Sequence, residues 1–208
     1  MSIKILAIVG SYRKGGTVDS AVDAILEGAR DKGAETHKIY LLDKHIEFCT
    51  NCRSCTQTPG PRRGKCVHND DVESILSEIE SADAIVLGAP VNFGNVTALF
   101  RRFMERLAVY VYWPWGQMAP ASRNKIRTKR AALVTSSAMP GFLIPFSTGA
   151  LNALKIAAKA IGLRPVATLG IGLSSRQRDQ ILAARTLSRA KKIGASLALT
   201  SHGLNRML

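Results

Sequence analysis

The chain has 208 residues, 46% of them hydrophobic, and a formal net charge of +14 at pH 7. This length and composition allow one sizeable hydrophobic core, which excludes a chain that stays disordered for want of apolar residues. No apolar run approaches the roughly 20 residues of a membrane-spanning helix and no basic leader precedes the first apolar stretch, so we expect a cytoplasmic protein without a membrane partner.

The charge is divided unevenly along the chain. Residues 1–100 carry 11 Lys and Arg against 13 Asp and Glu, whereas residues 101–208 carry 18 against 2. A basic half favours anionic partners such as nucleotides, acidic proteins or nucleic acid. No nucleic-acid-binding motif accompanies the charge, so we interpret it as a solvated basic face. A basic nucleic-acid-binding protein stapled by zinc is kept as an alternative from a different functional class.

Short apolar strands alternate with segments of helical periodicity along the chain. The pattern predicts strands over 3–11, 35–42, 83–91, 130–137 and 164–172. It predicts helices over 18–29, 70–79, 95–110, 148–162 and 175–199. Asp70 followed by Glu73 predicts a capping box at the start of the second helix. Strands that are apolar on both faces belong to a parallel sheet covered by helices on both sides.

Five strand–helix units predict an α/β fold, a flavodoxin-like three-layer sandwich with a five-stranded parallel sheet of order 2-1-3-4-5. A Rossmann dinucleotide-binding domain is the competing architecture. We expect one domain over residues 1–208, with a cysteine-rich loop at about 44–69 and long loops at 110–129 and 138–147. In such a sheet a ligand binds outside the carboxyl ends of the strands, at the switch point between strands 1 and 3.

The loop after the first strand, "GSYRKGGT" (10–17), combines glycines, hydroxyls and two basic side chains just before a helix. Exposed backbone N–H groups at a helix N-terminus form an anion site. The loop matches neither G-x-G-x-x-G nor the Walker motif, so the dinucleotide and nucleoside triphosphate fingerprints both fail. A monophosphate such as that of FMN fits better, and a plain glycine-rich turn is the alternative.

Two further loops follow strands that we expect to be neighbours. In "GAPVNFGNV" (88–96), Pro90 stiffens the turn, Gly94 permits close backbone approach, and Phe93 and Asn95 supply an apolar face and an amide. The alternative is a strand-to-helix turn with Asn95 as the helix N-cap. In "TSSAMPGF" (135–142), hydroxyl groups and a Pro-Gly turn can border the other side of a flat ring.

Together, "GSYRKGGT", "APVNFGNV…RRFMERL" and "FCTNCRSC…GKCVHNDDVESI" resemble the motifs of the NADPH-dependent FMN reductase family, and within it most those of the iron–sulfur flavoproteins. The resemblance covers nearly the whole chain. It implies FMN bound without covalent attachment, NAD(P)H as cosubstrate and a homodimer or homotetramer. The implied phosphate contacts are Ser11, Arg13, Gly15, Gly16, Thr17 and Val18. The implied ring contacts are Pro90, Val91, Asn92, Phe93, Gly94 and Asn95, with Thr135, Ser136 and Ser137 along the other edge.

The chain departs from the family pattern at three places in these loops. Tyr12 stands where the family often has proline, and Thr17-Val18 where it often has Asn-Thr, which removes one polar phosphate contact. Asn92 replaces the usual aromatic residue, so stacking on the flavin is lost there. Trp113 or Trp115 can cover a flavin instead, and core or interface positions are the other interpretation of these tryptophans.

All four cysteines lie in the loop after the second strand, so we expect them beside the flavin edge. Cys49, Cys52 and Cys55 have the compact C-x2-C-x2-C spacing of iron–sulfur ligands, and Cys66 supplies a fourth thiolate. This spacing favours a [4Fe–4S] cluster, while a four-cysteine zinc site and free thiols remain open. Ten residues separate Cys55 from Cys66, about twice the gap common in the family.

The resulting functional hypothesis is an FMN-dependent NAD(P)H oxidoreductase. Hydride from NAD(P)H reduces FMN, and electrons pass on to a quinone, another small-molecule acceptor or an iron–sulfur centre. No acid–base side chain is required for hydride transfer, so no catalytic residue is assigned. The alternative is an electron-transfer protein reduced by a protein partner, and the basic half of the chain then suits an acidic redox protein.

Overall fold

The computed structural model describes residues 2–175 and 180–199. Its main sheet has the strand order β2-β1-β3-β8-β9, and neighbouring strands are parallel throughout. These strands are β1 (Lys4–Val9), β2 (Glu35–Tyr40), β3 (Ala84–Gly88), β8 (Lys129–Ser136) and β9 (Leu163–Ile171). Counted along the chain, the order is 2-1-3-4-5, so the predicted flavodoxin-like sheet is confirmed.

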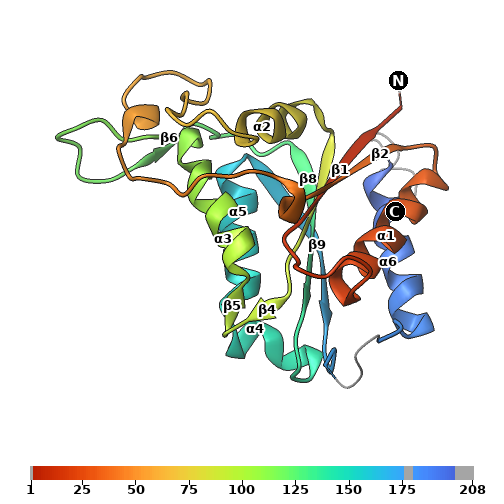
Figure 1. Ribbon diagram of the computed structural model, residues 1–208. Helices are drawn as coiled ribbons and strands as arrows, with labels where there is room; N and C mark the ends of the chain where they lie inside the picture. Colours follow the sequence, from red (N-terminus) through yellow and green to blue (C-terminus); the bar gives the residue numbers. More distant parts are fainter. Residues whose placement is uncertain (1, 176–179, 200–208) are drawn as a thin grey trace.

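Helices cover both faces of the sheet (Figure 1). One face carries α1 (Thr17–Arg30) and α6 (Ala184–Leu197), and the other carries α2 (Val72–Ser81), α3 (Ala98–Arg106) and α5 (Ala150–Ala160). Shorter elements are β4 (Val91–Asn92), β5 (Asn95–Val96), β6 (Val111–Tyr112), β7 (Ala121–Ser122), α4 (Ile144–Ser147) and the 3-10 turns η1 (Leu41–Asp43), η2 (Ser54–Thr56), η3 (Leu107–Tyr110) and η4 (Gly141–Leu143).

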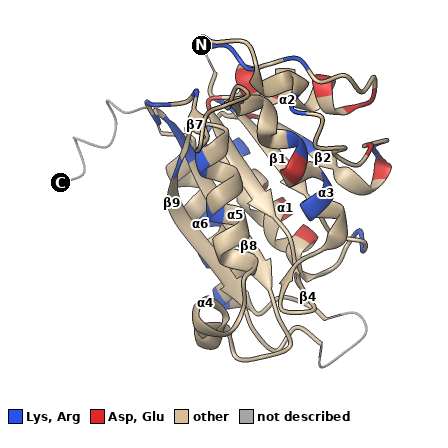
Figure 2. Ribbon diagram, turned by 90° about the vertical axis from the view of Figure 1, so that its left-hand side faces the viewer, with Lys and Arg blue, Asp and Glu red and all other residues tan. Residues whose placement is uncertain are grey.

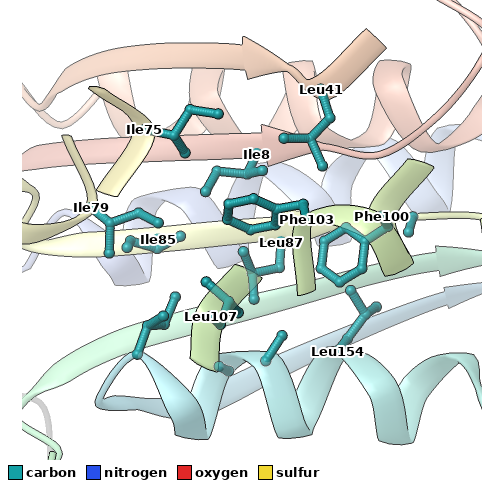
Figure 3. Close-up of a cluster of buried hydrophobic side chains, with 14 of the residues drawn as sticks. Ile8, Leu41, Ile75, Ile79, Ile85, Leu87, Phe100, Phe103, Leu107 and Leu154 are labelled. Carbon is teal, nitrogen blue, oxygen red and sulfur yellow. The ribbon is translucent and has the colours of Figure 1, made fainter. Parts of the chain in front are cut away.

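Side-chain alternation along the central strands divides the apolar residues between two cores. On β3, Ile85 and Leu87 point to the α2–α3–α5 side, whereas Val86 points to the α1–α6 side. Figure 3 shows the first of these cores, in which Phe100 and Phe103 of α3 meet edge-on with ring centroids 6.1 Å apart. Full burial of strands on both faces explains why their sequences are continuous apolar runs.

The predicted elements differ most from the observed ones at three places. The helix predicted over 95–110 begins at Ala98 and continues past Arg106 as η3, because residues 91–96 form the hairpin β4–β5. The closing helix predicted over 175–199 begins at Ala184; residues 176–179 of that prediction lie outside the described residues. The long loop predicted over 110–129 contains the small hairpin β6–β7.

The predicted capping box at the start of α2 is wrong. The N-cap is Asp71, without a side-chain capping hydrogen bond. Asp70 accepts a hydrogen bond from the Val72 N–H (3.1 Å), but Glu73 does not reach back, because it pairs with Arg63 of the cysteine-rich loop at 2.6 Å. A tertiary ion pair therefore replaces the local contact expected from the sequence.

Within the described part of the chain, no single helix combines the length and apolar character of a membrane span. One bent pair of helices, Gly141–Ser147 with Ala150–Ala160, passes that test by length and composition.

Candidate functional site

The carboxyl ends of β1, β3 and β8 meet at one edge of the sheet. The Gly10 N–H donates to Gly88 O at 2.8 Å, which joins the loop after β1 to the end of β3. The Ala89 N–H donates to Val134 O at 3.0 Å and joins the loop after β3 to β8. The three loops singled out in the sequence are therefore neighbours in space.

Thr97 ties the first two loops together. Its fully buried hydroxyl donates to Gly10 O at 2.6 Å and accepts from the Phe100 N–H at 3.1 Å, which makes it the N-cap of α3. The alternative of Asn95 as N-cap is wrong, since Asn95 lies in β5. A Thr two residues after an Asn is an equally good capping residue, so sequence alone did not separate them.

The loop between β1 and α1 has the form of an anion cradle. Ser11 is buried, and its hydroxyl accepts from the Arg13 N–H at 3.1 Å, which fixes the turn. Gly15 has a φ of +72°, a left-handed conformation that favours glycine. The N-cap of α1 is Gly16, which has no side chain to accept from the first helical turn. The N–H groups of that turn, at Thr17 and Val18, can therefore serve an anionic ligand.

An internal carboxylate supports this loop from behind. Asp19, 1% exposed, accepts from the Gly15 N–H at 2.6 Å and from the Tyr40 hydroxyl at 3.0 Å. Lys38 pairs with Asp19 at 2.9 Å and with Asp23 at 2.5 Å. Burial alone would lower the pKa of Lys38, but its hydrogen bonds to Asp23, Tyr40 and Asp19 outweigh burial and raise it. Asp19 is thereby paired with a lysine whose protonated form is favoured.

The loop after β3 contains the hairpin β4–β5, whose turn has two residues. Phe93 (φ +49°) and Gly94 (φ +76°) both have positive φ, as in a type I′ turn, and they connect β4 to β5. The Phe93 side chain is fully exposed at the tip. The Gly149 N–H donates to Gly94 O at 2.7 Å, so α5 anchors the hairpin. The ring-contact residues predicted over 90–95 therefore occupy a rigid turn beside the cradle.

The end of β8 supplies hydroxyl groups at the same edge. Thr135, Ser136 and Ser137 are all buried. The Ser137 Oγ accepts from the Met139 N–H at 3.3 Å, whereas Thr135 Oγ1 is buried without a hydrogen-bond partner among the described residues. A buried hydroxyl without a partner carries an energetic penalty unless a ligand satisfies it. The anion cradle, the rigid turn and this hydroxyl together fit a flavin mononucleotide.

Sequence reasoning missed the role of Tyr12. Its hydroxyl accepts from the Leu99 N–H at 3.2 Å, which links the phosphate loop to the first turn of α3. Tyr12 occupies a position where the family often has proline. Its partner Leu99 lies 87 positions away, so no local sequence pattern predicts the contact.

The four cysteines surround one cavity of about 230 Å³, together with His68 and Trp113. None of the four is paired in a disulfide. The Nε2 atom of His68 is buried without a hydrogen-bond partner among the described residues. In the described ranges, 2–175 and 180–199, no set of three or more Cys, His, Asp or Glu side chains has metal-binding geometry. The side chains around the cavity, four cysteines and a histidine with an unpartnered Nε2, are therefore of the kind that binds a cluster. Their positions do not already have the geometry of metal ligands.

The thiols influence one another across this cavity. Burial, followed by the proximity of Cys66, Cys49 and Cys52, raises the pKa of Cys55. Hydrogen bonds with the side chain and backbone of Ser54 lower the pKa of Cys52. Cys55 is therefore the cysteine whose pKa depends on the other three.

A buried ion pair connects this group to α3. Arg106, whose side chain is 1% exposed, contacts Asp70 at 2.5 Å and donates to the Sγ of Cys66 at 3.3 Å and to Glu47 O at 2.8 Å. Burial alone would raise the pKa of Asp70, but hydrogen bonds from Arg106 and from the backbone of Glu47 and Val72 outweigh it, so the pKa lies below its usual range. Arg106 was not singled out in the sequence, because a helical arginine normally faces solvent.

Within this chain the cysteines lie at the far end of α3 from the hairpin β4–β5, whereas the sequence predicted them beside the loops expected to hold the flavin. Helix α3 begins after Thr97, and its last residue, Arg106, contacts Cys66. Nine helical residues span about 13 Å. Figure 1 shows the cysteine-rich segment at the opposite end of α3 from the hairpin. The segment is also closed at its base, where the His45 N–H donates to the carboxylate of Asp71 (2.7 Å) and the Asp71 N–H donates to His45 O (3.0 Å).

The two tryptophans belong to the cysteine-rich side of the molecule. The guanidinium of Arg53, between Cys52 and Cys55 in sequence, lies 4.0 Å from the ring centroid of Trp113 and 4.2 Å from that of Trp115. Arg53 also donates to Trp113 O at 2.6 Å. Within the protomer these rings therefore hold the cysteine-rich loop and do not cover the cradle.

Comparison with known proteins agrees with this architecture. A sequence profile described as NADPH-dependent FMN reductase matches residues 3–144. An iron–sulfur flavoprotein of Archaeoglobus fulgidus is 34% identical over 112 residues, 54% of this chain and 49% of that protein. One from Methanocaldococcus jannaschii is 38% identical over 104 residues, 50% of this chain and 51% of that protein. The chain thus spans about half the length of the relatives it matches.

Solved structures share the fold at low sequence identity. An NAD(P)H:quinone oxidoreductase from Methanothermobacter marburgensis superimposes with a TM-score of 0.67 at 18% identity, covering 95% of this chain and 100% of that one. A flavone reductase gives a TM-score of 0.65 at 22% identity, over 94% of this chain and 62% of that one. These likenesses establish the three-layer fold.

Proposed function

Because this chain belongs to the NADPH-dependent FMN reductase family, we propose that it is an FMN-dependent NAD(P)H oxidoreductase. The observation that carries the proposal is the convergence of an anion cradle, a rigid turn and a buried, unpartnered Thr135 hydroxyl at one edge of the sheet. Hydride transfer from NAD(P)H and electron delivery to an acceptor are the chemistry that bound FMN supplies.

The residues of this chain then act by holding and orienting the cofactor. Ser11, Arg13 and the first turn of α1 bind the phosphate, through hydroxyl, guanidinium and backbone N–H groups. The turn over residues 90–95 contacts the ring system, and the Thr135 hydroxyl hydrogen-bonds a polar atom of the cofactor. Thr97 keeps these loops in register, because it bonds Gly10 O and caps α3 at once.

Anaerobic mixing with NADPH or NADH is expected to bleach the flavin absorbance of the purified protein. The result follows if bound flavin accepts hydride directly from the nicotinamide. Stopped-flow absorbance of the flavin bands measures it, with dithionite as the control reductant. Bleaching by dithionite but by neither nicotinamide would contradict the reductase proposal and favour an electron-transfer protein reduced by a protein partner.

We further propose that Cys49, Cys52, Cys55 and Cys66 bind a [4Fe–4S] cluster. The support is that the four thiols line one cavity and that a buried guanidinium faces Cys66. When bound, such a cluster supplies one-electron chemistry. The cysteines hold it by thiolate ligation, and Arg106 places a positive charge beside it.

Anaerobically purified protein is expected to contain about four iron and four sulfide per chain, as a [4Fe–4S] cluster requires. Iron and sulfide analysis, with a visible spectrum, makes the measurement, and Cys55→Ser is expected to lower both contents. Zinc at about one per chain with a colourless protein would replace this proposal by a four-cysteine zinc site. Flavin without either metal would leave free thiols and the reductase alone.

A small molecule such as a quinone is the proposed electron acceptor, with an acidic redox protein as the alternative. Figure 2 shows Lys and Arg near β7, and the segment that follows β7 carries the exposed side chains of Lys125 and Arg127. This basic segment suits an anionic partner. A homodimer or homotetramer in the cytoplasm, where thiols stay reduced, completes the proposal.

A further inference from the structure

The ten residues between Cys55 and Cys66 form a loop that closes on itself. Fully extended, a gap of this length reaches up to about 33–36 Å, so its sequence alone does not bring the two thiols together. In the structure, a Cβ added to Gly64 would lie only 1.7 Å from Cys55 O. The Gly64 N–H donates to Val109 O at 2.8 Å. The chain thus returns to Cys55 two residues before Cys66.

One side chain from another part of the chain holds the first half of this loop. Arg123 follows β7, and the residue is 8% exposed. Its guanidinium donates to Thr58 O at 2.8 Å, to Gly60 O at 2.9 Å and to Cys55 O at 3.4 Å. Its Nε donates to Val111 O at 3.2 Å, within the hairpin β6–β7. A single cation therefore gathers carbonyl groups from the start and the middle of the loop and fixes them to the hairpin.

The chemistry of arginine suits this position. A guanidinium offers five N–H donors in a rigid plane, so it can satisfy several carbonyls that converge on one point. A lysine ammonium carries fewer donors on a flexible stem and cannot reproduce the same set of contacts. In Figure 1 the cysteine-rich segment and the hairpin containing β6 lie beside each other, as these hydrogen bonds require.

We propose that Arg123 is a positioning residue that closes the ten-residue loop and thereby holds Cys66 beside Cys55. The inference deepens the proposed cluster site and rests on it for its function. The loop closure itself concerns the protein without any metal, so it can be tested separately.

The first test measures how readily the two thiols are joined. In the full-length Cys49→Ser/Cys52→Ser variant, Cys55 and Cys66 are the only thiols. Dibromobimane, which fluoresces after joining two nearby thiols, reports their proximity. Adding Arg123→Ala is expected to slow the fluorescence increase at least about fivefold, because several hydrogen bonds from a charged donor are lost. Arg123→Lys is expected to be intermediate, and Arg62→Ala, which removes an exposed arginine of the same loop, is expected to have no effect.

A compensating deletion separates loop closure from general stability. Deleting residues 58–62 shortens the gap to five residues, so the closure of the loop no longer depends on the hydrogen bonds of Arg123. The deletion is expected to restore rapid bridging in the Arg123→Ala protein. An unchanged rate in Arg123→Ala would overturn the proposal. So would a slow rate that the deletion fails to restore, since Arg123 would then support the hairpin fold alone. The same variants serve if Arg123→Ala folds poorly, because Arg123→Lys with and without the deletion gives the same comparison.

Iron analysis of the same Arg123 and deletion variants, with all four cysteines present, distinguishes the proposal on Arg123 from the proposal of a cluster. If Arg123→Ala lowers the iron content and the deletion of residues 58–62 restores it, both proposals are supported: loop closure by Arg123 and the cluster. If thiol bridging depends on Arg123 but the protein binds no iron, loop closure by Arg123 is supported and the cluster proposal is overturned. If the protein binds iron but thiol bridging does not depend on Arg123, the cluster proposal is supported and loop closure by Arg123 is overturned.

Discussion

Arg106→Leu is expected to lower the free energy of unfolding by about 3–5 kcal/mol at pH 7, the usual cost of removing one partner of a buried ion pair while the other stays buried. The substitution leaves the Asp70 carboxylate, 1% exposed, without its cationic partner. It also removes the donors to Glu47 O and to the Sγ of Cys66. Urea denaturation followed by circular dichroism measures the loss. Arg101→Leu, an exposed arginine on the same helix, is the matched control with an expected effect within about 0.5 kcal/mol.

The pH dependence of this effect has a defined sign. The folded-state pKa of Asp70 is lowered, so the stability it contributes is fully present above the ordinary aspartate pKa of about 3.9. That contribution is lost as pH falls below about 4 toward the folded-state value. The difference between the wild type and Arg106→Leu is therefore expected to shrink in acid. Asp70→Asn in the Arg106→Leu background removes the unpaired charge and is expected to regain part of the stability. A cost below about 1 kcal/mol for Arg106→Leu would show that the pair is solvated.

Thr135→Val is expected to weaken FMN binding about tenfold while leaving the flavin-free protein as stable as the wild type or more so. The two effects have opposite signs for one reason. The hydroxyl is buried without a partner among the described residues, so the flavin-free protein gains nothing from it. Valine has nearly the same shape, and it removes the desolvation penalty together with the hydrogen bond offered to a ligand.

Quenching of FMN fluorescence measures the affinity, and thermal unfolding of flavin-free protein measures the stability. Thr135→Ser retains the hydroxyl and is expected to keep most of the affinity, although the buried methyl group is lost. If Thr135→Val destabilised the flavin-free protein and bound FMN normally, the hydroxyl would have a structural partner and the cofactor would bind elsewhere.

The sheet was predictable because its evidence is local and repeated. The central strands β1, β3 and β8 are mostly apolar runs between glycine-rich or polar loops, and five strands at the spacing of strand–helix units permit few topologies. The loops at the strand ends followed from the same rule, since carboxyl ends of parallel strands meet at one edge. Their small residues and hydroxyls are local features too.

The contacts that hold the cysteine-rich loop were not predictable in this way. Arg106 and Arg123 are ordinary basic residues in the half of the chain that is rich in them, and Arg53 has no sequence signal that predicts its partner. Their partners lie 36, 65 and 60 positions away, and the tertiary packing of the cysteine-rich loop against α3 and the hairpin β6–β7 decides these contacts. The failed capping box has the same cause, because Arg63 takes the glutamate that the local motif required.

The reciprocal hydrogen bonds between His45 and Asp71 have an evolutionary consequence. They place the two ends of residues 46–70 next to each other, so this segment can be gained or lost as a unit without re-routing the sheet. Arg106 depends on this segment, because among the described residues its buried charge is compensated by Asp70, Glu47 O and the Sγ of Cys66, which all lie within residues 46–70. A homologous chain that lacks the segment is therefore expected to carry an uncharged residue at the position of Arg106, or a new acidic partner for it.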